Sequence, residues 1–211
     1  MQLVVEQHLR ELMNFKNLLN MSLLALLISC GGADGDGLFE DGISDGNHRV
    51  FVTSNTYNGN LGGISGADSI CNTEASSSGL KRTYKAILSS SLSSAFSRLN
   101  LTGKVYVFSD SETNSVVVNL GTDLWNTGSG GADLLSSINI DTNYNVVSLS
   151  PWTGTDSDGS ITLTGDMCQN WTSSSAAFQG QTGSTSSLND SWIEGISSNC
   201  NLSRRLYCIS I

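Results

Sequence analysis

Residues 59–94 read GNLGGISGADSICNTEASSSGLKRTYKAILSSSLSS, a stretch that joins a helical pattern to a strand-like one. Four apolar residues recur in it at spacings of three, four and four: Ile64, Ala67, Cys71 and Ala75. Such spacing places the four on one face of a helix. Ser65, with Asp68 three residues later, approximates a capping box in which Asp replaces the usual Glu. We therefore predict a helix over residues 65–77.

Outward from this stretch, short strand-like runs alternate with turn clusters. RVFVT at 49–53 precedes it, and residues 83–88 read as a strand at its end. A second amphipathic helix, with serines before it as cap candidates, is marked by Leu92, Ala95, Phe96 and Leu99. The later strand-like runs are VYVF at 105–108, VVV at 116–118, VVSL at 146–149 and LYCI at 206–209. Two early helices followed by many short strands predict an α+β fold.

The composition of the chain favours a single globular domain and argues against several other classes of protein. The chain has 211 residues, enough for one ordinary domain with appendages. Its 22 glycines and single proline suit a turn-rich globule and argue against a coiled coil or a solenoid. The formal net charge of −9 repels phosphate backbones, so we expect no binding to nucleic acid.

The first thirty residues resemble an export signal. LLNMSLLALLIS at 18–29 is apolar but shorter than the roughly 20 residues of a spanning helix. Lys16 supplies the positive charge before it, and LISC at 27–30 resembles the lipobox of bacterial lipoproteins. Residues 1–12 are unlike the start of a signal, so Met13 is the expected true start. The alternative is a helix of the mature protein over residues 9–29.

This interpretation divides the chain into three parts. Residues 1–29 are the predicted signal peptide, and Cys30 is the predicted site of lipidation. Residues 30–47 form a tether, because GGADGDGLFEDGISDGN at 31–47 holds six glycines, five acidic residues and little that could pack. A calcium site in DGDG is the alternative, but the other oxygen ligands of a binding loop are missing. Residues 48–211 are the predicted folded domain.

The chain has five cysteines, so one is left over if the others pair. If Cys30 carries lipid, four remain in an exported protein, and two disulfides are expected. Spacing alone leaves three pairings open. Zinc would need closer cysteines or nearby histidines, so we expect no metal.

Three segments carry a resemblance to a known family. Residues 59–94 contain GAD before a helical cysteine and a strand that ends in LSS. WTGTDSDGSITLTGDMCQNWTSSSAAFQGQTGSTSSL at 152–188 holds Trp-x-Gly, a turn, Cys-x-x-Trp and Thr-Gly in order, and NCNLSRRLYCI at 199–209 supplies the closing cysteines. These segments resemble the endostatin domain of collagens XV and XVIII. With a lipobox in front, the whole resembles the leptospiral endostatin-like lipoproteins.

The resemblance implies a fold and a function. The endostatin fold is a variant of the C-type lectin-like fold, and the family pairing would join Cys71 to Cys208 and Cys168 to Cys200. Members of the lipoprotein family are surface proteins that bind host matrix proteins and complement regulators. The expected function is therefore that of a non-catalytic, adhesin-like lipoprotein, lipid-anchored in the bacterial envelope and exposed on the outer membrane.

Two other functions stay open, a carbohydrate-binding lectin and a structural envelope protein without a host ligand. Sugar could stack on tryptophans, but we expect all four to lie in the core: Trp125, Trp152, Trp171 and Trp192. The calcium-dependent lectins use a Trp-Asn-Asp triplet, whereas this chain has NDSW at 189–192. The zinc site of mammalian endostatin uses clustered histidines, of which only His48 is present here beyond the signal region.

Enzymatic chemistry is not indicated. The chain beyond the signal region has one histidine, no Ser-His-Asp order and no glycine-rich phosphate loop. We therefore predict no enzyme and no cofactor.

Positive charge gathers in one segment of this acidic protein. No acidic residue lies between Ala75 and Ser109, where five of the eight cations from His48 onward occur: Lys81, Arg82, Lys85, Arg98 and Lys104. Endostatin binds heparan sulfate through arginines, and Arg98 has a place similar to one of them. The segment predicts a basic face for an acidic partner such as a sulfated glycan or a host protein. The alternative is a solvated surface with no partner.

Overall fold

The computed structural model of the protein describes residues 46–109, 115–127 and 131–211. The chain divides into two units, and every described residue belongs to the second, Leu38–Ile211. The predicted signal peptide, the lipidation site Cys30 and the tether up to residue 45 lie outside the described residues.

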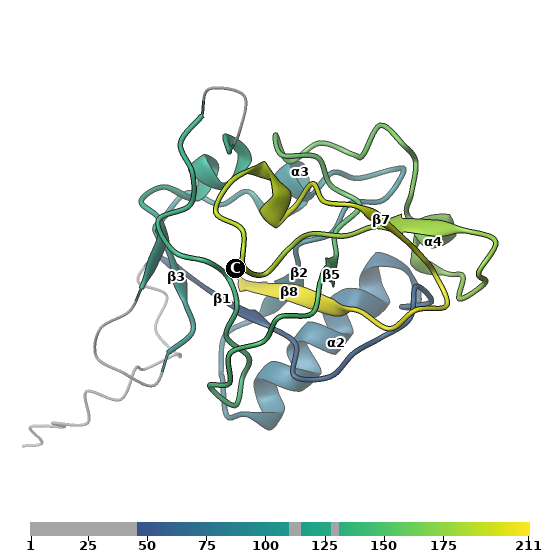
Figure 1. Ribbon diagram of the computed structural model, residues 1–211. Helices are drawn as coiled ribbons and strands as arrows, with labels where there is room; N and C mark the ends of the chain where they lie inside the picture. The colour runs from purple at the N-terminus through teal and green to yellow at the C-terminus, as the bar shows by residue number, and fades with distance from the viewer. Residues whose placement is uncertain (1–45, 110–114, 128–130) are drawn as a thin grey trace, which may run out of the picture. The chain divides into compact units, whose positions relative to one another are not determined.

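Few helices and many short strands make up the described chain (Figure 1), which confirms the α+β prediction. The helices are α2 (Gly63–Ser77), α3 (Ala95–Leu99), the single turn α4 (Cys168–Trp171) and the 3-10 turns η1 (Gly121–Trp125) and η2 (Asp190–Trp192). The strands are β1 (His48–Val52), β2 (Tyr84–Ala86), β3 (Val105–Val107), β4 (Val116–Val118), β5 (Pro151–Trp152), β6 (Gln179–Gln181), β7 (Ser197–Asn199) and β8 (Arg205–Ser210).

The main sheet is mixed and has the order β2-β8-β1-β3-β4, with β5 pairing to β8 beside this path. β8 runs antiparallel to both β1 and β2, whereas β1 and β3 are parallel. β6 and β7 form a separate antiparallel pair. The last strand of the chain therefore lies inside the main sheet, between the first two strands.

Alternating side chains divide the core between the two faces of this sheet. Val50 and Val52 of β1 belong to one buried cluster, which also contains Trp125 and Trp192. Phe51, which points to the opposite face, belongs to a second cluster with α2 and both disulfides. A strand whose side chains are buried on both faces needs apolar residues at consecutive positions, and VFV of β1 supplies them.

Helix α2 covers the second face with the residues that the spacing predicted. Ala67, Cys71 and Ala75 are buried, and Ile64 packs beside them. The capping box is wrong, because the helix begins after Gly62, whose φ of 79° suits a glycine, and no side chain caps it. Asp68 instead accepts a hydrogen bond from the backbone N–H of Ala86 in β2.

Two other elements predicted from the sequence differ in the structure: one helix is shorter than predicted, and one predicted strand does not form. The second helix forms only over Ala95–Leu99, capped by the Ser94 side chain, while Leu92 lies outside it and is 93% exposed. The run at 146–149 forms one isolated bridge and no strand, and Val146 is 73% exposed. A short apolar run is compatible with a strand, but also with a loop that buries a single side chain. Here the loop buries Val147.

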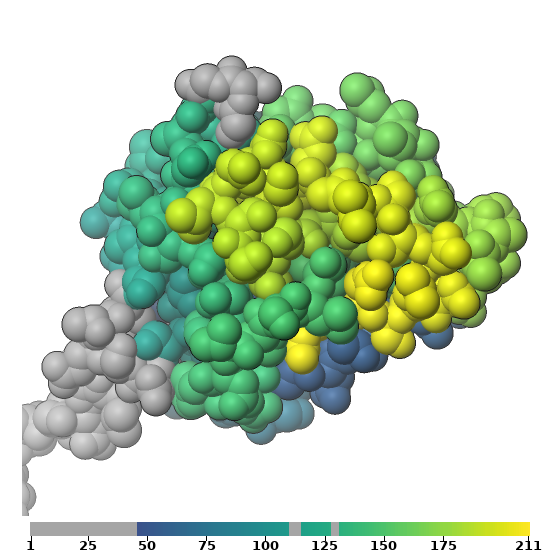
Figure 2. Space-filling view, viewed as in Figure 1, coloured from purple at the N-terminus to yellow at the C-terminus, as the bar shows by residue number. Residues whose placement is uncertain are grey.

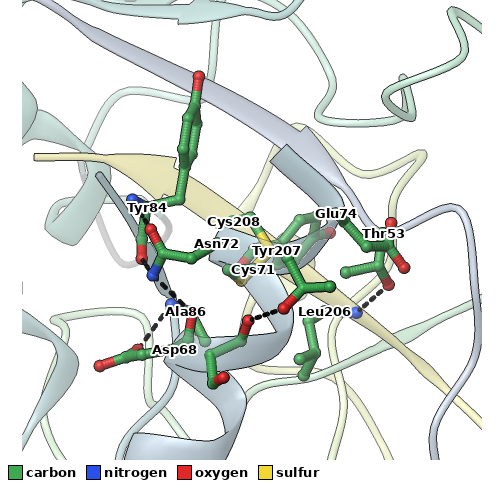
Figure 3. The surroundings of a disulfide bond; sticks show 12 residues. Thr53, Asp68, Cys71, Asn72, Glu74, Tyr84, Ala86, Leu206, Tyr207 and Cys208 are labelled. Carbon is green, nitrogen blue, oxygen red and sulfur yellow. Dashed lines mark hydrogen bonds between the residues drawn. A yellow bond between two sulfur atoms is a disulfide. The ribbon is translucent and has the colours of Figure 1, made fainter. Parts of the chain in front are cut away.

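Two disulfides confirm the expected disulfide-bonded domain. Cys71 of α2 bonds to Cys208 of β8, and Cys168 bonds to Cys200, which are the cysteines that the resemblance pairs. Figure 3 shows the first bond between the helix and the last strand. It closes a separation of 137 residues, for which the chain-entropy account gives about 5 kcal/mol.

Turn α4 has an unusual backbone. Its four residues have φ values of 48°, 54°, 57° and 65°, all in the left-handed region that non-glycine residues avoid. Three contacts hold this turn in place: the Cys168–Cys200 disulfide, the indole N–H of Trp171 on the Ser89 carbonyl at 2.6 Å, and the Asn170 side chain on the Ser91 N–H.

Residues of the second half of the chain cover the face of the molecule that is turned toward the viewer in Figure 2. They lie in front of the segment that contains β1 and α2, little of which is visible in this view. On this face of the domain, the later loops therefore cover the early strand and helix.

Candidate functional site

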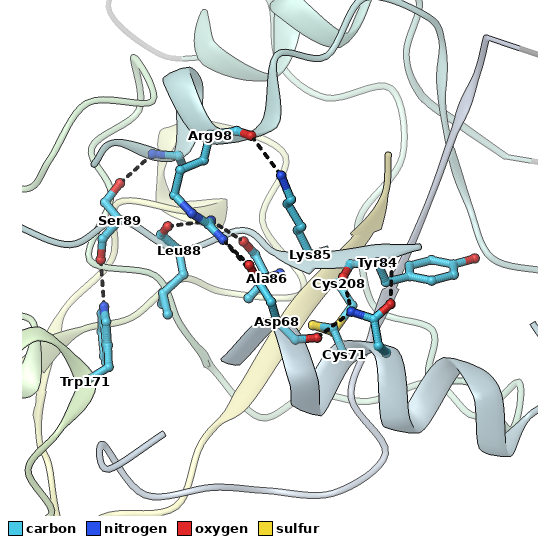
Figure 4. Close-up of polar contacts among 12 residues, drawn as sticks. Asp68, Cys71, Tyr84, Lys85, Ala86, Leu88, Ser89, Arg98, Trp171 and Cys208 are labelled. Atoms are coloured by element: carbon cyan, nitrogen blue, oxygen red, sulfur yellow. Dashed lines mark hydrogen bonds and ion pairs between the residues drawn. A yellow bond between two sulfur atoms is a disulfide. The ribbon is translucent and has the colours of Figure 1, made fainter. Parts of the chain in front are cut away.

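The structure separates the five basic residues that the sequence groups together. Arg98 lies in α3, and its guanidinium forms an ion pair with Asp68 of α2 (Figure 4). The same side chain donates to the carbonyls of Ala86 and Leu88, and it is only 9% exposed. Arg98 therefore holds the fold together and does not belong to a binding face, because its donors are taken by α2 and by the segment 86–88.

Lys85 also lies apart from the expected face. It is the middle residue of β2, and the neighbours on either side of it, Tyr84 and Ala86, belong to the buried cluster against α2. Since side chains alternate along a strand, Lys85 points to the other side of the sheet. Its ammonium donates to the Arg98 carbonyl at the end of α3, at 3.4 Å, where positive charge is favourable.

The remaining basic residues approach one end of the sheet, where β1, β2 and β3 begin. Arg82 donates to the Asn47 carbonyl at 2.7 Å, and the Lys104 backbone N–H donates to the Asn47 side chain at 3.0 Å. Lys81 is the exposed neighbour of Arg82. Asn47, immediately before β1, is thus held between the start of β2 and the start of β3.

Arg49 lies at the same end of the sheet, although it is outside the basic stretch of sequence between Ala75 and Ser109. Parallel pairing of β1 and β3 sets Arg49 opposite Tyr106, and the guanidinium lies 4.7 Å from the centre of the Tyr106 ring. This is a cation–π contact. Alternation with the buried Phe51 could place Arg49 on the α2 side of the sheet, but no local signal shows that β3 lies beside it.

We call Arg49, Lys81, Arg82 and Lys104 the sheet-end basic cluster. The end of β8 fixes its backbone, because the Arg49 N–H donates to the Ser210 hydroxyl and the Ile211 N–H donates to the Thr83 carbonyl. Guanidinium groups match planar anions such as carboxylate and sulfate, and lysines add mobile charges. The charge of this cluster therefore suits an anionic partner.

Glu74 is a buried carboxylate that has a structural role. It accepts hydrogen bonds from the backbone N–H groups of Ser54 and Asn55 and from the Tyr57 hydroxyl, at 2.6, 3.1 and 2.8 Å. Burial, and then the hydrogen bond and charge of Glu74, raise the pKa of Tyr57. Arg205 donates to the carbonyls of Thr53 and Ser54 from the other side. Together these contacts fix the loop after β1 against α2.

All four tryptophans lie in the core, as predicted. Trp152 and Trp171 are fully buried, and Trp125 and Trp192 nearly so. The indole of Trp152 donates to the Tyr57 carbonyl, and that of Trp192 donates to the Thr127 hydroxyl. A buried indole offers no ring face on which a sugar could stack.

Within residues 46–109, 115–127 and 131–211, no three histidine, cysteine, aspartate or glutamate side chains gather in a group that could hold a metal ion. None of the helices in this part of the chain has both the length and the apolar character needed to cross a membrane.

Residues 54–188 match a family described as a protein of unknown function, DUF1554. The chain belongs to the DUF1554 family. Among curated proteins, none matches it. The DUF1554 match includes α2, β2 and α3 but ends before β7 and β8, and it begins after β1. Since β1 and β8 are paired inside the main sheet, the folded unit of this DUF1554 protein extends beyond the matched residues on both sides.

Proposed function

We propose that this protein is a surface lipoprotein whose domain binds acidic regions of host macromolecules through the sheet-end basic cluster. The observation that carries the proposal is that Arg82 and the backbone of Lys104 both contact Asn47 at the end of the sheet where Arg49 lies over the ring of Tyr106. From His48 onward the chain has twelve acidic and eight basic residues, so a local gathering of cations opposes the charge of the whole. Matrix glycoproteins, complement regulators and sulfated glycans are the proposed partners.

The proposed fold is the endostatin-like variant of the C-type lectin-like fold. The two disulfides support it, since they join Cys71 to Cys208 and Cys168 to Cys200 as the resemblance implies. A helix directly followed by a strand at 63–86 supports it as well. Anchoring by lipid on Cys30 at the outer membrane completes the proposal, and mass spectrometry of the membrane-extracted protein should find that cysteine acylated.

Binding of the oxidised chain to laminin, fibronectin, complement factor H and heparin at physiological salt tests the function. We expect saturable binding to at least one of these, lost when the disulfides are reduced. The variant Arg49→Gln/Lys104→Gln should bind about tenfold more weakly, because exposed charge contacts contribute up to about 1 kcal/mol each. Lys85→Gln/Arg204→Gln removes the same charge elsewhere and is the matched control.

Equal weakening in both double variants would show that only net charge matters and would remove the cluster from the proposal. Absence of binding to every partner, with the protein shown to be folded and oxidised, would favour an envelope role without a host ligand. Calcium-dependent retention on a glycan array would favour a lectin instead.

A further inference from the structure

Strand β2 lies at one end of the main sheet, and among the described strands only β8 pairs with it. Thr83 and Ile87, which flank β2, bond through their backbones to the last residues of the chain. Because backbone groups alternate in direction along a strand, those of Tyr84 and Ala86 point away from β8. Unpaired N–H and C=O groups at such an edge are a template on which another strand can pair.

Side chains occupy the place of a neighbouring strand at this edge (Figure 3). Asn72 of α2 accepts a hydrogen bond from the Tyr84 N–H at 2.9 Å and donates one to the Tyr84 carbonyl at 2.7 Å. Asp68, one helical turn earlier, accepts from the Ala86 N–H at 2.9 Å, and Arg98 donates to the Ala86 carbonyl at 2.9 Å. All four outward backbone groups of Tyr84 and Ala86 therefore have side-chain partners.

The spacing of Asp68 and Asn72 suits this arrangement. Residues four apart rise about 6 Å along a helix, and residues two apart rise about 6.8 Å along a strand. Asp68 therefore reaches Ala86 while Asn72 reaches Tyr84, with α2 antiparallel to β2. An asparagine amide offers both an acceptor and a donor, as the backbone of a paired strand does.

We propose that the edge of β2 is a strand-addition surface for β2 of a second copy of this chain, and that Asp68, Asn72 and Arg98 block it. A second copy fits because its own β2 offers the same four groups in the reverse order. Antiparallel pairing centred on Lys85 sets Tyr84 of one copy opposite Ala86 of the other, with four backbone hydrogen bonds across a twofold axis.

Lys85 is a second obstacle to this pairing. It lies between Tyr84 and Ala86, so the register centred on it places the lysines of the two copies opposite each other. Like charges directly opposite each other destabilise a strand pair. The blocking side chains and this lysine together keep copies of the domain from joining their sheets.

Amide hydrogen exchange of the native full chain tests the block. The amides of Tyr84 and Ala86 should exchange within about tenfold of the rate of Ile87, whose N–H bonds to β8. Asn72→Ala should speed exchange at Tyr84 by at least about tenfold. Thr73→Ala, at an exposed position of α2, should leave it unchanged. Fast exchange at Tyr84 in the native chain, or equal effects of the two substitutions, would overturn the proposal.

Sedimentation equilibrium of the oxidised full chain tests the partner. The variant Asp68→Ala/Asn72→Ala/Arg98→Met/Lys85→Thr lacks the three blocking side chains and the lysine, and it loses both members of the ion pair together, so no buried charge is left unpaired. It should form a dimer with a dissociation constant on the order of 1 mM, a value that four backbone hydrogen bonds of ordinary net strength support.

The native chain and Val117→Ala should show no such dimer at the same concentration. Val117 is fully buried in β4, so its truncation lowers stability without changing β2 and controls for destabilisation alone. A folded fourfold variant that stays monomeric, or equal association of Val117→Ala, would refute the proposal. If the fourfold variant does not fold, Asn72→Ala/Lys85→Thr decides, since it frees both groups of Tyr84 and should associate more strongly than the native chain.

Discussion

Arg98 in α3 and Asp68 in α2 are joined by one guanidinium nitrogen that lies 2.7 and 2.8 Å from the two carboxylate oxygens. The other terminal nitrogen of Arg98 donates to the carbonyls of Ala86 and Leu88. One side chain thereby connects both early helices to β2 and the residues that follow it. This ion pair explains why a cation from the basic stretch of sequence lies apart from the sheet-end basic cluster.

Changing Arg98 to Met should lower the free energy of unfolding by about 3 kcal/mol, because Asp68 and two carbonyls lose their donor in a largely buried site. Urea denaturation measures the loss. Lys81→Met, at an exposed position of the same stretch, should change stability by less than about 0.5 kcal/mol. Similar losses in the two variants would contradict a structural role for Arg98.

Removing either disulfide should lower the free energy of unfolding, and the loss should be larger for Cys71–Cys208 than for Cys168–Cys200. The chain-entropy account gives about 5 kcal/mol for Cys71–Cys208 and about 4 kcal/mol for Cys168–Cys200, whose separations are 137 and 32 residues. Paired cysteine-to-alanine variants, unfolded in urea, give both values. A larger loss for the shorter loop would show that strain or denatured-state structure outweighs loop closure.

The left-handed backbone of turn α4 implies that a glycine substitution in this turn should stabilise the protein. Gln169 is exposed and has a φ of 54°, a conformation that costs a non-glycine residue about 1–2 kcal/mol. Gln169→Gly should therefore raise the melting temperature. Ser76→Gly, within α2, is the opposite control and should lower stability by about 0.5–1 kcal/mol. A lower melting temperature in Gln169→Gly would mean that contacts of its side chain compensate the backbone.

The buried Tyr207 should make the stability of the folded domain decrease at alkaline pH. Burial raises the pKa of its hydroxyl, which donates to the Trp192 carbonyl at 3.0 Å. An unfolded tyrosine loses its proton near pH 10, so above that pH the unfolded state binds fewer protons than the folded state. Stability then falls as pH rises, by up to about 1.4 kcal/mol per pH unit for this group.

Tyr207→Phe should reduce that slope by a similar amount in urea denaturation between pH 9.5 and 11.5. At pH 7 the variant should be about 1 kcal/mol less stable than the native chain, because the Trp192 carbonyl loses its donor. Parallel slopes for the two proteins would indicate that other groups control the alkaline transition.

The sequence predicts where the helices and strands of this fold lie better than it predicts which residues and strands contact each other. Periodicity locates α2 and β8 because each has one clear pattern, and burial of the tryptophans follows from their size. The position of Arg98 is not accessible in this way, since its partner Asp68 lies 30 residues earlier, outside the basic stretch. Similarly, Arg49 and Tyr106 meet only through the parallel pairing of β1 and β3, which no local pattern reveals.

β8, the last strand of the chain, has β1 on one side and β2 and β5 on the other. β1 and β2 are therefore synthesised early. The strand that pairs with both of them, β8, is not available until residues 205–210 leave the ribosome. A ribosome that still holds these residues leaves β1 and β2 without their shared neighbour and keeps Cys71 and Cys208 apart. The domain can therefore complete its main sheet only after β8 has been synthesised.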